Sequence, residues 1–125
     1  MIEGAVNAAH EAVVGLRVQG PSGRTRDLRA VVDTGFSRFL TLPPAIVAEL
    51  GLAFTGIDRF FLADGSEVTL HVYAVTVLWD GQPRDVDALV ADSTPLAGML
   101  LLDGHRLCVD VEDGGRVVIE PTARG

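Results

Sequence analysis

The stretch VVDTGFSRFLTLP, residues 31–43, places an aspartate directly after an apolar run and follows it with threonine and glycine. A β-branched apolar run of this kind is typical of a strand, and such a strand would ordinarily deliver another apolar side chain at position 33. A carboxylate at its end must be hydrogen-bonded, paired or used in chemistry, because burying it without a partner costs free energy. The interpretation of the chain therefore depends on Asp33.

The sequence on both sides of Asp33 predicts short strands joined by turns. Apolar and polar residues alternate over residues 14–18 and 28–32, and the segment GPSG between them is typical of a turn. We therefore expect a hairpin that leads into Asp33. Residues 39–42 again have the composition of a strand. The segment PPAIVAELGL that follows, with prolines at its start and Gly51 near its end, predicts a short helix that buries Ile46 and Leu50.

Residues 59–79 are the most β-like part of the chain. Asp64-Gly65 has the composition of a two-residue turn in a tight hairpin. The apolar phase of the returning arm changes near Val75, which predicts a bulge or a strand that passes between two sheets. Further strands are expected over residues 86–91, 107–111 and 116–119.

The leucine-rich segment at residues 93–107 interrupts the β pattern and predicts one or two helical turns that bury residues 100–102. With so many short strands and so little helix, the chain is predicted to be all-β, a small closed barrel with one or two short helices. Its 125 residues predict a single domain, 1–125, with flexible ends at about 1–11 and 120–125.

Composition excludes several classes of partner. The formal net charge of −7 is not accompanied by a basic stripe, so we expect no nucleic-acid partner. The N-terminal segment has no basic region typical of a signal peptide, and the longest apolar run, PLAGMLLL, is too short to span a bilayer. We expect a cytoplasmic protein with no membrane partner. The single cysteine, Cys108, is interpreted as a small buried hydrophobe, which fits a reducing compartment.

Four features of the sequence together resemble the retropepsin-like aspartic proteases. They are the triplet Asp33-Thr34-Gly35 after an apolar strand, the segment FLTLP after the triplet, the hairpin with Asp64-Gly65 at its tip, and Leu96-Ala97-Gly98 ahead of a predicted short helix. The resemblance covers residues 14–119. It implies the acid protease barrel as the fold and peptide-bond hydrolysis as the activity.

The resemblance also assigns roles to individual residues. Asp33 would be the catalytic aspartate, and Thr34 and Gly35 would complete the active-site turn. Substrate would be bound by the residue after this turn and by the hairpin tip, which acts as a closing flap: Phe36, Ala63, Asp64, Gly65 and Ser66. Leu96, Ala97 and Gly98 would form the loop through which the active-site turn is threaded. The sequence departs from the family pattern at Phe36, where a small residue is common, and at Ala97, where a larger aliphatic residue is usual.

Elementary chemistry supports this assignment. Hydrolysing a peptide without a metal or a covalent nucleophile needs one group that accepts a proton from water and another that donates one to the carbonyl oxygen. Two carboxylates held close together share a proton and so provide both groups. One chain supplies one such aspartate, Asp33, so we expect a homodimer with the two copies of Asp33 near its two-fold axis. We expect no cofactor.

A metal site is not predicted, because His10, His71 and His105 lack the spacing of metal ligands and are interpreted as surface or strand-face residues. Other aspartates near turns and on strand faces are interpreted as solvated acids: Asp58, Asp64, Asp85, Asp87 and Asp92.

Three other interpretations of the Asp-Thr-Gly triplet compete with the catalytic one. In the first, Asp33 has a structural role only and caps a turn, with Gly35 supplying a positive φ. The segment DTGFS also matches the phosphate loop of actin-like kinases and ATPases, but 125 residues are too few for the two lobes of that fold. In the third, the chain is a retropepsin-like dimerisation or peptide-binding module that does not cleave peptides.

Overall fold

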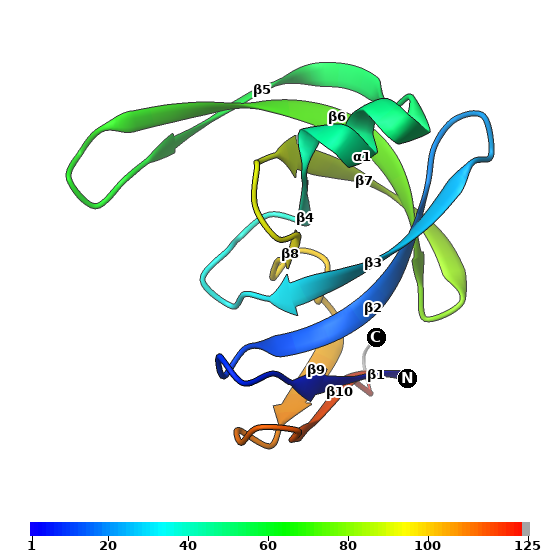
Figure 1. Ribbon diagram of the computed structural model, residues 1–125, viewed down its shortest axis with the longest axis vertical. Coiled ribbons are helices and arrows are strands. Elements are labelled where there is room, and N and C mark those ends of the chain that lie inside the picture. Colours follow the sequence, from blue (N-terminus) through cyan, green and yellow to red (C-terminus); the bar gives the residue numbers. More distant parts are fainter. Residues whose placement is uncertain (124–125) are drawn as a thin grey trace.

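The computed structural model of the protein describes residues 1–123. These residues form one ten-stranded sheet and one short helix (Figure 1). The elements are β1 (Ile2–Val6), β2 (Ala12–Gln19), β3 (Thr25–Val32), β4 (Leu40–Leu42), α1 (Pro44–Leu50), β5 (Ala53–Phe61), β6 (Glu67–Trp79), β7 (Gln82–Val90), β8 (Leu96–Ala97), β9 (His105–Val109) and β10 (Arg116–Pro121). The predicted all-β class is confirmed, with one helix.

Six of the strands close into a barrel. Going round it, the order is β6, β7, β4, β8, β3 and β2, and a further pairing of β2 with β6 completes the ring. Antiparallel pairs such as Val18 with Val77 make this last contact. The interior is filled by side chains that are almost fully buried: Val18, Ala30, Leu40, Val77 and Ala88. Strand β5 extends the sheet beyond β6, and β1, β10 and β9 extend it beyond β2.

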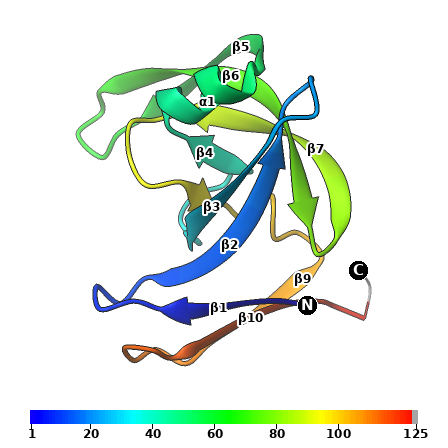
Figure 2. The same cartoon turned by 45° about the vertical axis from the view of Figure 1, so that its right-hand side comes forward.

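The local predictions around Asp33 are confirmed. Strands β2 and β3 form the expected hairpin, with Leu16 opposite Leu28. Helix α1 begins at a proline and ends at Gly51, and it buries Ile46, Val47 and Leu50 against the barrel. The helix closes one side of the barrel above β3 and β4 (Figure 2).

Strand β6 runs without a break through two environments, which explains the change of apolar phase near Val75. Its first part pairs with β5 in a hairpin that projects from the barrel, and its last part pairs with both β7 and β2. In the barrel the side chains of Val75, Val77 and Trp79 point inwards and are buried. The irregularity in register lies in β5 instead, between Phe54 and Gly56.

Three expectations are corrected by the structure. Residues 2–6 form β1, which pairs with β2 and β10 and is therefore part of the sheet rather than a flexible end. At the other end, Glu120 and Pro121 belong to β10, and residues 124–125 lie outside the described part. Cys108 is exposed, because alternation along β9 turns its side chain away from the core.

The third correction concerns the segment after β8. Residues 99–104 form consecutive hydrogen-bonded turns and no helix, since the chain must enter β9 at His105. Leu101 and Leu102 are nevertheless buried as expected, whereas Leu100 is exposed. Among residues 1–123, no helix is long and apolar enough to cross a membrane.

Candidate active site

Strand β3 delivers Asp33 to a turn at the surface of the barrel. Val31 and Val32 pair in parallel with Leu96 and Ala97 of β8. The backbone N–H of Asp33 donates to the carbonyl oxygen of Ala97 at 2.9 Å, and the N–H of Phe36 donates to the carbonyl oxygen of Asp33 at 3.1 Å. The position of Asp33 is therefore held by backbone hydrogen bonds on both sides.

The segment Leu96-Ala97-Gly98 lies against the loop that follows Asp33. Gly98 N–H donates to the carbonyl oxygen of Phe39 at 2.9 Å, and Met99 N–H donates to that of Phe36 at 2.8 Å. The contact at Gly98 is so close that a Cβ there would clash with the backbone oxygen of Arg38 and lie 2.6 Å from Cδ2 of Phe36. Only glycine fits at this crossing, and the small Ala97 beside it is fully buried.

The carboxylate of Asp33 uses one oxygen locally. Its Oδ1 accepts the backbone N–H of Gly35 at 2.9 Å, which is the bond that an aspartate capping a turn makes. Its Oδ2 takes no hydrogen bond from any residue in the described range 1–123. Asp33 is half-buried, and Thr34 and Gly35 beside it are exposed. One carboxylate oxygen therefore remains open for a proton, water or a second carboxylate.

The surface beside Asp33 is hollowed and mostly apolar. A shallow hollow of about 420 Å³ is lined by Asp33 and Thr34 and by residues from β1, β2, β3, β8 and β9 and the loops next to them. Val111, 69% exposed, lies at this hollow, together with Val6, Val32 and Leu107. An apolar surface around a partly exposed carboxylate is suited to contact with another protein surface.

The hairpin of β5 and β6 is the predicted flap, and its tip differs in detail from the prediction. Leu62 N–H donates to Ser66 O at 2.8 Å and Gly65 N–H donates to Leu62 O at 2.9 Å. The loop therefore has three residues, Ala63, Asp64 and Gly65, with Gly65 at φ +84°. Ser66 donates to Asp64 Oδ1 through its hydroxyl at 2.6 Å and its N–H at 2.9 Å, and these bonds lower the pKa of Asp64.

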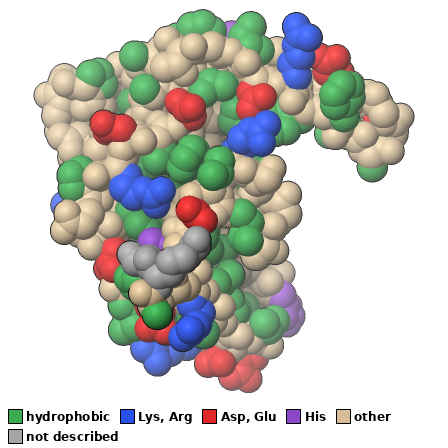
Figure 3. All heavy atoms as spheres, turned by 180° about the vertical axis from the view of Figure 1, so that it is seen from behind, with side chains coloured by type: hydrophobic (Ala, Val, Ile, Leu, Met, Phe, Trp, Pro, Cys, Tyr) green, Lys and Arg blue, Asp and Glu red, His purple; other side chains and the backbone are tan. Residues whose placement is uncertain are grey.

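The hairpin projects beyond the barrel on the side where the loop after Asp33 lies (Figures 1 and 2). From behind, it stands out as an arm with open space beneath it (Figure 3). Phe61 and Leu62, near its tip, are 75% and 52% exposed. The hairpin therefore overhangs the side of the barrel that carries the loop after Asp33 (Figure 1), and two apolar side chains are exposed near its tip.

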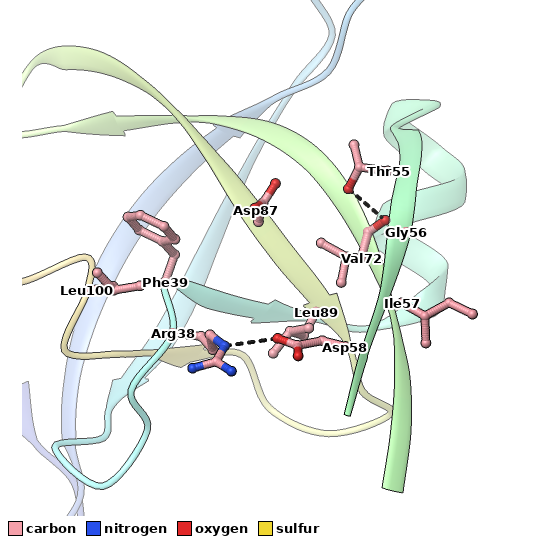
Figure 4. Close-up of a pocket in the computed structure, with 10 residues that line it drawn as sticks. All are labelled: Arg38, Phe39, Thr55, Gly56, Ile57, Asp58, Val72, Asp87, Leu89 and Leu100. Carbon is pink, nitrogen blue, oxygen red and sulfur yellow. Dashed lines mark hydrogen bonds and ion pairs between the residues drawn. The ribbon is translucent and has the colours of Figure 1, made fainter. Parts of the chain in front are cut away.

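Sequence reasoning missed an ion pair that ties the hairpin to the loop after Asp33. Arg38 Nε donates to Asp58 Oδ2 of β5 at 2.9 Å (Figure 4). The Arg38 guanidinium also lies 5.3 Å from the ring centre of Phe60. The hydrogen bond from Arg38 holds the pKa of Asp58 below its ordinary value. Asp58 is thus not a freely solvated acid, and no local sequence signal indicated its distant partner.

The structure brings the predicted residues into two groups. Asp33, Thr34, Gly35, Phe36 and the segment 96–98 form one, at the crossing of two loops. Ala63, Asp64, Gly65 and Ser66 form the other, at the tip of the arm, and no hydrogen bond joins the two groups within residues 1–123. The same residues contain no group of three or more His, Cys, Asp or Glu side chains arranged to hold a metal ion.

Comparison with solved structures identifies the fold. The EIAV protease in complex with the inhibitor HBY-793 superposes with a TM-score of 0.60 at 19% identity, covering 77% of this chain and 88% of that one. A retropepsin-like aspartic protease from Rickettsia conorii gives 0.57 at 18% identity, covering 98% and 91%. The simian foamy virus (mac) protease gives 0.50 at 17% identity, covering 70% and 90%.

No protein-family model and no curated protein matches the sequence. The assignment therefore rests on three-dimensional structure. The chain has the fold of the retropepsin-like aspartic proteases.

Proposed function

We propose that the chain is an aspartic endopeptidase that acts as a homodimer. The observation that carries the proposal is the placement of Asp33, at the end of a barrel strand, fixed by backbone bonds and with Oδ2 open, in a fold shared with aspartic proteases. If Asp33 only capped a turn, this would account for the hydrogen bond from Gly35 N–H to its Oδ1. It would not explain the overhanging hairpin.

A second copy of the chain supplies the second carboxylate. The sequence has one Asp-Thr-Gly triplet, and two carboxylates that share a proton are needed to act as base and acid at once. The apolar hollow around Asp33, with Val111 exposed at its edge, is the surface that a second copy would cover. Each Asp33 would then face the other across a two-fold axis.

In the dimer, the two carboxylates act on a water molecule between them. The ionised member takes a proton from the water as it attacks the peptide carbonyl carbon, and the protonated member gives its proton to the carbonyl oxygen. In the tetrahedral intermediate, the first carboxyl gives the proton it took from water to the leaving nitrogen. The second carboxylate takes a proton from a hydroxyl of the intermediate, the carbonyl re-forms, the C–N bond breaks, and the pair again holds one proton. The hairpin arms lie over the peptide and exclude bulk water during these steps.

Hydrolysis at different protein concentrations tests the proposal. We expect unfolded protein or peptides to be cleaved, with a specific activity that falls on dilution because the site exists only in the dimer. Sedimentation over the same concentrations would show monomer replacing dimer. Full specific activity from a protein that sediments only as a monomer would contradict the homodimeric site.

A further inference from the structure

A second hollow lies beside the loop that follows the turn of Asp33, at the base of the hairpin. Its volume is about 390 Å³, and it is bounded by the loop after Asp33, by β5 and β6, and by β7 (Figure 4). Phe39, Val72, Leu89 and Leu100 give it apolar walls. It is large enough to receive one long side chain of a bound peptide.

Two of the charged groups in this hollow neutralise each other. Arg38 Nε donates to Asp58 Oδ2, and the guanidinium lies over the ring of Phe60. The other oxygen of Asp58, Oδ1, accepts the backbone N–H of Arg59 at 2.9 Å. Arg38 and Asp58 are therefore engaged with each other and add no net charge.

The third charged group, Asp87, is unpaired. Its carboxylate makes no hydrogen bond or ion pair with any residue in the described part of the chain, and in Figure 4 it stands apart from the Arg38–Asp58 pair. Across the sheet it faces Ala74, which is too small to cover it. Asp85, on the same face of β7, accepts the hydroxyl of Thr76 at 2.7 Å. The hollow thus carries a net charge of −1, from one positive and two negative side chains.

We infer that this hollow binds a basic side chain, lysine or arginine, of the peptide substrate. The inference rests on the proposed function, in which a peptide lies between the hairpin and Asp33. Lysine and arginine have long apolar stems and cationic ends, and they bury the stem along apolar surface while the charge meets a carboxylate. Phe39, Val72, Leu89 and Leu100 receive the stem, and Asp87 receives the charge.

The position of the hollow and the charge of the whole chain agree with this specificity. Arg38 and Phe39 line the hollow and Asp33 does not, so we assign the side chain it receives to a substrate residue away from the scissile bond. The net charge of −7 draws basic peptides towards the surface from solution. An acidic side chain in the hollow would be repelled by Asp87.

Binding to the Asp33→Asn protein tests the inference separately from cleavage. A short apolar host peptide carries lysine, norleucine or glutamate at one position at a time, and norleucine keeps the apolar stem of lysine without its charge. We expect one position at which lysine binds about fivefold more tightly than norleucine, equivalent to ~1 kcal/mol, and glutamate more weakly than both. The preference for lysine should weaken as salt is added.

Variants of β7 assign the preference to one carboxylate. In the Asp33→Asn background, Asp87→Asn should remove the preference for lysine, and Asp87→Lys should reverse it in favour of glutamate. Asp85→Asn makes the same charge change on the same strand face outside the hollow and should leave the preference intact. Thermal unfolding of each variant shows that it is folded.

The possible results separate the inference from the proposed function. Equal binding of lysine and norleucine at every position, or a lysine preference that survives Asp87→Asn, would overturn the inference. Cleavage of the same peptides by the wild-type chain reports on the endopeptidase alone. Peptides that bind with the expected preference and are never cleaved would support the hollow and contradict the endopeptidase.

Discussion

Arg38 donates a hydrogen bond through Nε to Oδ2 of Asp58 at 2.9 Å, and this bond joins the loop after the Asp-Thr-Gly turn to the outgoing strand of the hairpin. The tip of this hairpin extends beyond the barrel (Figure 1). The ion pair is therefore placed to limit how far the arm lifts.

Breaking this ion pair should loosen the hairpin without unfolding the barrel. In Arg38→Ala we expect faster amide hydrogen exchange over residues 53–67 and little change in Tm, since both partners lie near the surface. Arg17→Ala is the matched control, because it removes a similar surface pair, with Asp27, between β2 and β3. Unchanged exchange in Arg38→Ala would mean that the pair does not restrain the arm.

The same ion pair should open in acid. Because Arg38 lowers the pKa of Asp58 in the folded chain, the stabilisation is complete above the unfolded pKa of about 3.9 and is lost as the pH falls through the lower folded value. The carboxyl carbon shift of Asp58, followed by NMR, should titrate at lower pH in the wild type than in Arg38→Ala. Identical titrations in the two proteins would show that the pair is not formed in solution.

A side chain at the hairpin tip should impair activity more than stability. Gly65 has φ +84° with open space around it, so Gly65→Val costs backbone strain of about 1–2 kcal/mol and creates no clash. Gly81→Val is the control, because Gly81 has φ +80° in the turn between β6 and β7 and is equally open. We expect similar losses of stability, and a kcat/KM about tenfold lower for Gly65→Val alone.

Equal kcat/KM for these two variants would mean that the hairpin tip takes no part in closing over the substrate. Chemical denaturation of both variants measures the free energy of unfolding that each one loses.

The crossing of the two loops should tolerate no added atom. Gly98→Ala would drive a Cβ into the backbone oxygen of Arg38 and the ring of Phe36, and we expect a loss of about 3 kcal/mol in the free energy of unfolding. Gly15→Ala, in the middle of β2 with nothing near its Cβ position, should change stability by less than about 0.5 kcal/mol. Similar denaturation midpoints for the two variants would contradict the packing at Gly98.

Local patterns in the sequence were enough to predict the hairpin before Asp33, helix α1 and the projecting hairpin. Each depends on neighbouring residues: alternation along β2 and β3, prolines and Gly51 around α1, and Asp64-Gly65 at the tip. The roles of the Asp-Thr-Gly triplet and of Leu96-Ala97-Gly98 came from the resemblance to the retropepsin-like aspartic proteases, and the structure packs the two segments together.

Long-range contacts account for what the sequence did not predict. Strand β1 is ordered because it pairs with β10 from the opposite end of the chain. The Arg38–Asp58 pair joins residues from a loop and a strand that only the folded barrel brings together. Asp87 was interpreted as one more solvated acid. The sequence does not reveal that, within residues 1–123, Asp85 accepts a hydrogen bond from Thr76 whereas Asp87 accepts none.

The proposed reaction depends on a single carboxylate in each protomer, and the most direct test is the activity of Asp33→Asn. The amide has nearly the size of the carboxylate and accepts the N–H of Gly35 in the same way, so the fold and the sedimentation of the protein should be unchanged. Because an amide cannot take a proton from water, we expect kcat/KM for peptide hydrolysis to fall at least about a hundredfold. A folded Asp33→Asn protein that cleaves the same peptide at the wild-type rate would remove Asp33 from the mechanism and contradict the account.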